Sequence, residues 1–311
     1  MRMKVAVLGA SGMLGSMVVH YLSQQSEVQL TATVRTEMLA VTCSERVSGV
    51  AWRLFDAGEG TMPGFFDDQE WIVNCIGVIK PYIRDNCAEK VERAVRVNAL
   101  FPHLLARVAE KCGCRVLQIA TDCVYSGVKG GYTEHDAHDP QDVYGKTKSL
   151  GEAYSPNVHH LRCSIIGPEP KAKVSLLEWF LAQQKGAHVS GYVNHQWNGI
   201  TTLQFARLCY GAMQEPIALP HVQHVVPSGA TSKCDLLRCF RREYGRDDIT
   251  VVLTEADTTV DRTLSTTNQE LNSTIWAAAG YSGPPSIPQM VGELAAWSGP
   301  SEKWRRHHGI G

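Results

Sequence analysis

Tyr144 and Lys148 are the two residues of this 311-residue chain whose types and spacing most directly suggest chemistry. They are four residues apart, so on a helix both side chains project from one face. A tyrosine phenol has a pKa of about 10, and a nearby ammonium ion favours its ionised form. A phenol tuned in this way can move a proton near neutral pH, so the pair predicts general acid–base catalysis. The spacing itself is common, and an exposed helix face is the alternative interpretation.

Thr121 supports the catalytic interpretation because of its place in the chain. It follows the apolar run 115–120, which is typical of a buried strand, and ligands of open α/β sheets bind at the carboxyl ends of strands. Thr121 lies 23 residues before Tyr144 (144 − 121 = 23), and its hydroxyl could hydrogen-bond the carbonyl oxygen that Tyr144 protonates. We therefore predict a catalytic role for Thr121, with a turn or helix-cap threonine as the alternative.

A glycine-rich loop near the start of the chain predicts a dinucleotide site. The sequence GASGMLG follows the apolar run 5–8, and apolar residues then recur at 14, 17, 18, 21 and 22, which indicates an amphipathic helix. In such a strand–turn–helix unit Gly9 allows a tight turn, Gly12 opens the helix N-terminus to a pyrophosphate, and Gly15 lets the helix pack closely on the strand. The residues of this loop predicted to contact the cofactor are Gly9, Ser11, Gly12, Met13, Leu14 and Gly15.

Arg35 predicts which dinucleotide is bound. It lies 20 residues beyond Gly15 (35 − 15 = 20), at the end of the strand-like segment 28–34, where an acidic residue would hold the ribose 2′-hydroxyl of NAD. An arginine at this position suits a 2′-phosphate instead. We predict NADPH as the cofactor, with NADH as the alternative, because an arginine on a loop is often only a solvated charge.

Composition excludes several classes of function. The chain has 30 basic and 31 acidic residues without a long run of either sign, which argues against binding to nucleic acid or to a membrane surface. It contains neither an unbroken run of 18 apolar residues nor a signal peptide pattern at its start, so we expect a cytoplasmic protein. The ten cysteines and twelve histidines lack metal-ligand spacing, and no metal is predicted.

The remaining pattern predicts an α/β protein with a Rossmann-type, doubly wound parallel sheet. Strand-like segments alternate with helical stretches, the clearest of which are 88–112 and 145–154; the strand-like segments are 28–34, 50–55, 71–76, 115–120 and 160–166.

The character of the chain changes after residue 167. A helix is predicted at 171–186, another at 232–244, and a strand at 249–253. We predict a dinucleotide-binding domain at 1–166, joined by a return pass near 200–215, and a smaller, mainly substrate-binding lobe at 167–311.

Several motifs in order resemble the extended short-chain dehydrogenases/reductases, and within them the dTDP-4-dehydrorhamnose reductase-like group. The motifs are GASGMLG from Gly9, NCIG from Asn74, VNALFP from Val97, ATDCVY from Ala120, YTEHD from Tyr132, YGKTK from Tyr144, and Gly151-Glu152. The resemblance covers residues 3–205, with weaker agreement as far as Arg262. The loop spacing GxxGxxG is the form typical of short-chain enzymes.

The resemblance implies hydride transfer from a nicotinamide to the 4-keto carbon of a nucleotide-linked 6-deoxysugar. Thr121, Tyr144 and Lys148 match the catalytic triad, in which the tyrosine protonates the alkoxide and the lysine also holds the nicotinamide ribose. Asn98 matches the position that supports the active-site helix and its water. The further contacts implied are Asp56 (at the adenine), Cys75, Ile76 and Gly77 for the cofactor, and Asp122, Val124, Trp197, Asn198 and Arg262 (at the sugar diphosphate) for the substrate.

Other activities are consistent with the same motifs. A 4,6-dehydratase would need an Asp-Glu pair after the threonine, whereas Asp122 is followed here by Cys123, so elimination is disfavoured. Two alternatives stay open: an epimerase or dehydrogenase of the same superfamily, and a non-catalytic regulatory subunit that binds the dinucleotide and a partner enzyme. The resemblance also raises a homodimer in which ranges 88–112 and 145–154 pair.

Overall fold

The parallel sheet at the centre of the protein has the strand order of a dinucleotide-binding fold. The computed structural model describes residues 2–60, 64–170 and 174–297, and within these ranges seven strands form one sheet in the order β11-β6-β5-β4-β1-β2-β3, with every neighbouring pair parallel. The strands are β1 (Met3–Leu8), β2 (Val28–Val34), β3 (Val50–Leu54), β4 (Trp71–Asn74), β5 (Arg115–Ala120), β6 (Val158–Arg162) and β11 (Val222–His224). The predicted Rossmann-type α/β fold is confirmed.

Both faces of the sheet are buried at its centre, where residues 5–8 of β1 and Trp71–Asn74 of β4 are all buried. Val5 and Val7 of β1 belong to one core cluster, whereas Ala6 and Leu8 point to the other face and belong to a second cluster. The strand order reverses between β1 and β4, so the loops after these two strands diverge there and leave room for a ligand. The glycine loop follows β1 at this point.

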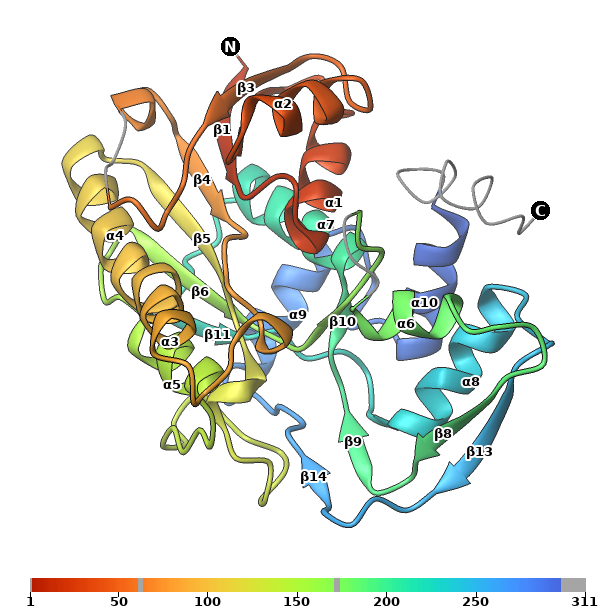
Figure 1. The fold of residues 1–311 in the computed structure, drawn as a ribbon. Coiled ribbons are helices and arrows are strands. Elements are labelled where there is room, and N and C mark those ends of the chain that lie inside the picture. The colour runs from red at the N-terminus through yellow and green to blue at the C-terminus, as the bar shows by residue number, and fades with distance from the viewer. Residues whose placement is uncertain (1, 61–63, 171–173, 298–311) are drawn as a thin grey trace.

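Two layers of helices cover the sheet (Figure 1). The helices of one face include α1 (Met13–Leu22) and α7 (Thr202–Gln214), whose buried residues join the first cluster, and those of the other include α3 (Ala88–Ala94) and α4 (Phe101–Cys112). Between α3 and α4 the chain forms a π-helical turn, Val95–Leu100, so the predicted helix at 88–112 is continuous with a local change of pitch. Helix α2 (Glu37–Ser44) lies between β2 and β3.

The part of the chain after residue 164 forms smaller sheets and four further helices among the described residues. β7 (Ile165–Ile166) pairs with β10 (Ile200–Thr201), β8 (His188–Tyr192) with β13 (Thr250–Thr254), and β9 (His195–Trp197) with both β12 (Thr231–Ser232) and β14 (Val260–Asp261). The helices are α6 (Leu176–Leu181), α8 (Lys233–Glu243), α9 (Gln269–Ala278) and α10 (Ile287–Ala296). The division into domains at residue 166 stays a prediction, since the first core cluster runs from Val5 to Ala295.

Two predicted helices have different bounds in the structure. The helix expected at 145–154 is α5 (Val143–Leu150): the Asp142 side chain caps its start by accepting a hydrogen bond from Gly145 N, and Gly151 ends it. The helix expected at 171–186 is α6, which has the N-cap Ser175 and the C-cap Ala182; residues 171–173 of this prediction lie outside the described residues. No helix among the described residues is both long and apolar enough to cross a bilayer. The tail from Ser298 lies outside the described residues.

Candidate active site

The glycine loop has the shape that a pyrophosphate requires. Gly9 has φ +79°, and a Cβ there would lie 2.9 Å from the Ile76 side chain. A Cβ at Gly15 would lie 2.2 Å from the Gly9 carbonyl oxygen, so only glycine lets α1 pack this closely on the turn. At Gly12, the N-cap of α1, a Cβ would meet nothing closer than 3.4 Å, and no side chain caps the helix. The N-terminus of α1 is thus free to receive a phosphate, and the site fits a dinucleotide.

The neighbouring loops place the other predicted cofactor residues at the same edge of the sheet. Residues 75–77 follow β4, and Asp56 follows β3, where one of its carboxylate oxygens accepts a hydrogen bond from Gly58 N at 2.8 Å. Arg35 is exposed at the end of β2 and makes no hydrogen bond or ion pair with the residues that the structure describes. Its guanidinium group is therefore available to a ligand, as the prediction of a 2′-phosphate site requires.

Thr121 and Tyr144 come together although they are on different elements. Thr121 follows β5 and caps the 3-10 turn Asp122–Val124, since its Oγ1 accepts from Cys123 N at 3.2 Å. Thr121 lies close enough to the Tyr144 phenol to favour the phenolate, yet burial has the larger effect and raises the pKa of Tyr144 above its usual range. The phenol is therefore protonated at neutral pH, which is the form that a general acid needs.

Lys148 lies one turn after Tyr144 on α5, and its ammonium is directed to the end of β5. It donates there to the Ile119 carbonyl at 3.1 Å. The expectation that Lys148 lowers the pKa of the Tyr144 phenol stays a prediction. Burial lowers the pKa of Lys148 to about 8, with an opposing contribution from the Glu152 carboxylate.

Two glycines and Asn98 fix helix α5 and hence Tyr144. A Cβ at Gly145 would lie 2.2 Å from the Cys123 carbonyl oxygen, and one at Gly151 would lie 1.9 Å from the Asn98 carbonyl oxygen. Asn98 is buried in the π-helical turn, where its amide accepts from Val78 N at 2.8 Å and donates to Thr147 Oγ1 at 3.2 Å. It therefore joins the loop after β4 to α5, which is consistent with the positioning role implied by the resemblance.

The predicted substrate residues divide into two groups. Asp122 is near the acid, since its Oδ1 accepts from Thr121 Oγ1 at 3.2 Å, and Arg262 lies against the Tyr125 carbonyl, to which its Nε donates at 2.8 Å. Trp197, Asn198 and Val124 are instead buried in the protein.

These three buried residues support the site from within. The Trp197 indole donates to Ser164 Oγ at 2.8 Å, and both ends of the Asn198 amide bond to the backbone of Leu264. The Val124 side chain is fully buried in a cluster with Tyr125, and its substrate contact stays a prediction. Asn198 fixes the segment that carries Arg262.

Sequence analysis missed a buried ion pair behind the site. The Arg162 guanidinium on β6 donates to both Glu152 carboxylate oxygens at 2.5 and 2.6 Å, and to the Tyr125 hydroxyl at 2.5 Å. Glu152 belongs to the Gly151-Glu152 motif of the resemblance, but nothing in the sequence linked it to Arg162. The pair stabilises the junction between the end of α5 and β6.

A second missed residue is Lys233, at the first position of α8. Its ammonium lies 5.3 Å from the centre of the Trp197 ring and close enough to Asp122, Cys123 and Arg262 for charge to act between them. The sequence around Lys233 gave no signal, because only the pairing of β12 with β9 brings the start of α8 over Trp197.

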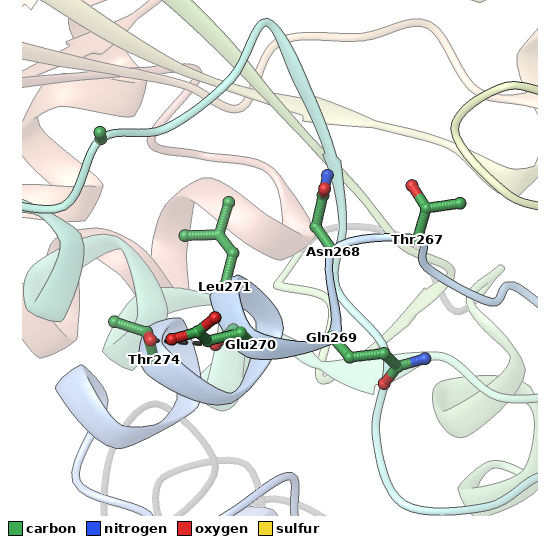
Figure 2. A pocket seen from close by; sticks show the side chains of 7 residues that line it. Thr267, Asn268, Gln269, Glu270, Leu271 and Thr274 are labelled. Carbon is green, nitrogen blue, oxygen red and sulfur yellow. Dashed lines mark hydrogen bonds between the residues drawn. The ribbon is translucent and has the colours of Figure 1, made fainter.

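A polar hollow lies away from these residues. It measures ≈ 590 Å³ and is formed by Ala218 and the beginning of α9, where polar side chains line it (Figure 2). None of the predicted site residues lines this hollow.

Comparison with known proteins agrees with the fold and the motifs. The family described as the RmlD substrate binding domain matches residues 3–295. The chain belongs to the RmlD substrate binding domain family. The predicted resemblance to extended short-chain dehydrogenases/reductases of the dTDP-4-dehydrorhamnose reductase-like group is thereby confirmed.

Individual relatives of this RmlD-family chain are distant. The dTDP-4-dehydrorhamnose reductase of Mycobacterium tuberculosis H37Rv is 30% identical over 155 residues, which are 48% of this chain and 44% of that protein, so the match spans less than half of the relative's length. A dTDP-4-dehydrorhamnose reductase structure from Clostridium acetobutylicum has a TM-score of 0.69 at 21% identity and covers 94% of this chain and 98% of that one. The Bacillus anthracis enzyme in complex with NADP has a TM-score of 0.69 at 16% identity, covering 94% and 99%.

Proposed function

We propose that this RmlD-family protein reduces the 4-keto group of a nucleotide-diphospho-6-deoxysugar with NADPH. The observation that carries the proposal is the closeness of Thr121 to the buried Tyr144 phenol, at the same sheet edge as a glycine loop shaped for a dinucleotide. The names of the relatives support the substrate class, and the NADP held by the Bacillus anthracis enzyme supports the cofactor.

Thr121, Tyr144 and Lys148 each have a part in this reaction that follows from their positions. Bound NADPH supplies the hydride. Tyr144 donates its phenolic proton to the ketone oxygen as that oxygen becomes an alkoxide, and the Thr121 hydroxyl donates a hydrogen bond to the same oxygen. Lys148 releases the Ile119 carbonyl and binds the nicotinamide ribose, which places its ammonium beside the phenol.

The cofactor residues bind the rest of the dinucleotide. The backbone of the loop from Gly9 to Gly15 receives the pyrophosphate. Ser11, Met13 and Leu14 belong to this loop and contact the cofactor as part of it. Arg35 pairs with the 2′-phosphate, Asp56 contacts the adenine, and the segment Cys75, Ile76 and Gly77 lies along the nicotinamide half. Burial raises the pKa of the Cys75 thiol above its usual range, so this group stays neutral beside the cofactor.

Removal of the Tyr144 phenolic hydroxyl group tests the proposal. Folded protein is mixed with NADPH and dTDP- and UDP-linked 4-keto-6-deoxysugars, and the nicotinamide absorbance is followed. We expect turnover in the natural protein and a decrease in kcat of about a hundredfold or more in Tyr144→Phe, because a general acid contributes at least that factor.

The matched control is Tyr154→Phe, which removes the same atom from an 84% exposed tyrosine beyond the end of α5 and should keep full activity. NADPH binding without turnover of any 4-keto sugar would contradict the proposal and favour a regulatory subunit. Interconversion of unreduced nucleotide sugars without net consumption of NADPH would favour an epimerase.

A further inference from the structure

Lys233 is a partly buried cation beside the predicted substrate residues, and its ammonium lacks an acceptor among the described residues. It makes no hydrogen bond and no ion pair there. Lys80, whose charge also acts on Cys123, is instead paired with Asp142 at 2.6 Å. Burying an ammonium without an acceptor costs free energy, so the position of Lys233 favours a bound anion.

Arg262 provides a second incomplete set of donors beside Lys233. Its Nε is used by the Tyr125 carbonyl, whereas its two terminal nitrogens make no hydrogen bond with the described residues. The carboxylates around the two cations already have partners: Asp122 accepts from Thr121, Asp139 accepts from Ser126 N at 2.7 Å, and Asp142 pairs with Lys80. The donors left over are therefore those of Lys233 and Arg262.

The two cations come from separate elements that meet beside the acid. Lys233 starts α8 and Arg262 follows β14, and β9 pairs with both β14 and the strand β12 that leads into α8 (Figure 1). Trp197 on β9 lies beneath the Lys233 ammonium and fixes its position. Asp122 and Cys123, which follow Thr121 directly, face the same ammonium from the side of β5.

We propose that Lys233 is a binding residue for the diphosphate group of the substrate and shares that group with Arg262. This inference rests on the proposed function in so far as the substrate is a nucleoside diphosphate derivative. Two cations with unused donors suit two adjoining phosphates, and the diphosphate would lie one sugar ring away from the ketone at Tyr144. The charged groups facing Lys233 are Asp122, Cys123 and Arg262.

The titration of Lys233 gives the subsite a pH dependence. Burial lowers the pKa of Lys233 to about 8, with smaller opposing effects from Asp122 and Cys123. The ammonium is present below that pH and is lost above it, so affinity for a diphosphate should decrease as the pH rises through about 8. Burial raises the pKa of Cys123 to about 12, so this thiol stays neutral throughout the range.

The test measures binding of dTDP and UDP by titration calorimetry with saturating NADP⁺, and needs no turnover. We expect Lys233→Met to weaken binding of the better of the two nucleotides at pH 7 by about tenfold or more, the loss typical of a charge-assisted contact with phosphate. Lys233→Arg should stay within about threefold of the natural protein at pH 7 and keep its affinity at pH 9, where the natural protein has lost most of its own.

Controls separate the proposal from general damage and from failure of the proposed reaction. Lys185→Met removes the same charge from an exposed site in the same part of the chain and should bind dTDP normally. Unchanged NADP⁺ affinity and melting temperature show that the Lys233→Met protein is folded. If this variant does not fold, the affinity of Lys233→Arg and its dependence on pH test the proposal instead. Equal dTDP affinity in Lys233→Met, or no nucleotide binding by the natural protein, overturns the proposal. Lys233-dependent binding without reduction of any sugar overturns the proposed reaction alone.

Discussion

Tyr144 shows how far the chemistry of one residue depends on its surroundings. Burial keeps its phenol protonated, and the neighbouring Thr121 acts in the opposite direction without overcoming burial. A protonated phenol is ready to act as an acid, which suits reduction, whereas oxidation would require the phenolate as a base. When the Lys148 ammonium moves to a bound ribose, its charge should lower the pKa of the phenol and make the proton easier to transfer.

Arg35 is the residue that should determine cofactor choice. We expect Arg35→Ala to weaken NADPH binding by about tenfold or more while leaving NADH binding nearly unchanged, because only NADPH carries the 2′-phosphate. The measurement is the dissociation constant of each cofactor by fluorescence titration.

The control for this prediction is Arg107→Ala, which removes an exposed arginine from α4 on the other face of the sheet. Equal losses for NADH and NADPH in Arg35→Ala would show that the arginine does not distinguish the two cofactors.

At the scale of elements, the position of α5 is the decisive feature. The helix is held between Cys123 on one side and the π-helical turn with Asn98 on the other, and in both places the contact is so close that only glycine fits. π-helical turns are often found at functional sites, and here the turn brings Asn98 within hydrogen-bond distance of Thr147. The backbone packing of α5 therefore brings Tyr144 close to Thr121.

Gly145→Ala tests this packing. The added methyl would be forced against the Cys123 carbonyl, so we expect a decrease in the free energy of unfolding of about 1–3 kcal/mol, together with a lower kcat as α5 shifts. The free energy is measured by urea unfolding.

Gly283→Ala is the control, because a Cβ at that position meets nothing within 4 Å. A Gly145→Ala protein with unchanged stability and activity would show that α5 adapts to the methyl group without cost.

At the scale of the whole molecule, the helical layer that contains α5 leaves apolar side chains uncovered. Val95 and Leu100 of the π-helical turn are 41% and 50% exposed, and Leu150 at the end of α5 is 64% exposed. These residues belong to the two helices that the predicted homodimer would pair, and covering them would bury apolar surface. The dimer stays a prediction.

Leu150→Arg tests the dimer by sedimentation or light scattering. We expect a dimer for the natural protein and a monomer for the variant, because a buried unpaired arginine would oppose association. Met38→Arg, at a 75% exposed position on α2, should leave the assembly unchanged. A monomeric natural protein, or a dimer that survives Leu150→Arg, would contradict this arrangement.

Local sequence was sufficient for the sheet and the phosphate loop. The strands 28–34 and 115–120 have the predicted bounds, because each is a short apolar run between turns, and the glycine loop is recognisable from spacing that acts within a single strand–turn–helix unit. The proximity of Thr121 and Tyr144 also followed from sequence, since residues at the ends of parallel strands and at the start of the next helix share one edge.

Only the tertiary structure decided which polar groups are used inside the protein and which face the site. The Asn198 amide bonds to Leu264, 66 residues away, and Lys233, for which the sequence gave no signal, lies over Trp197. The direction of the Lys148 ammonium likewise depends on the Ile119 carbonyl, 29 residues earlier. Spacing predicts contacts made within one element, whereas the burial of a charge and the choice of its partner depend on segments that meet only when the chain has folded.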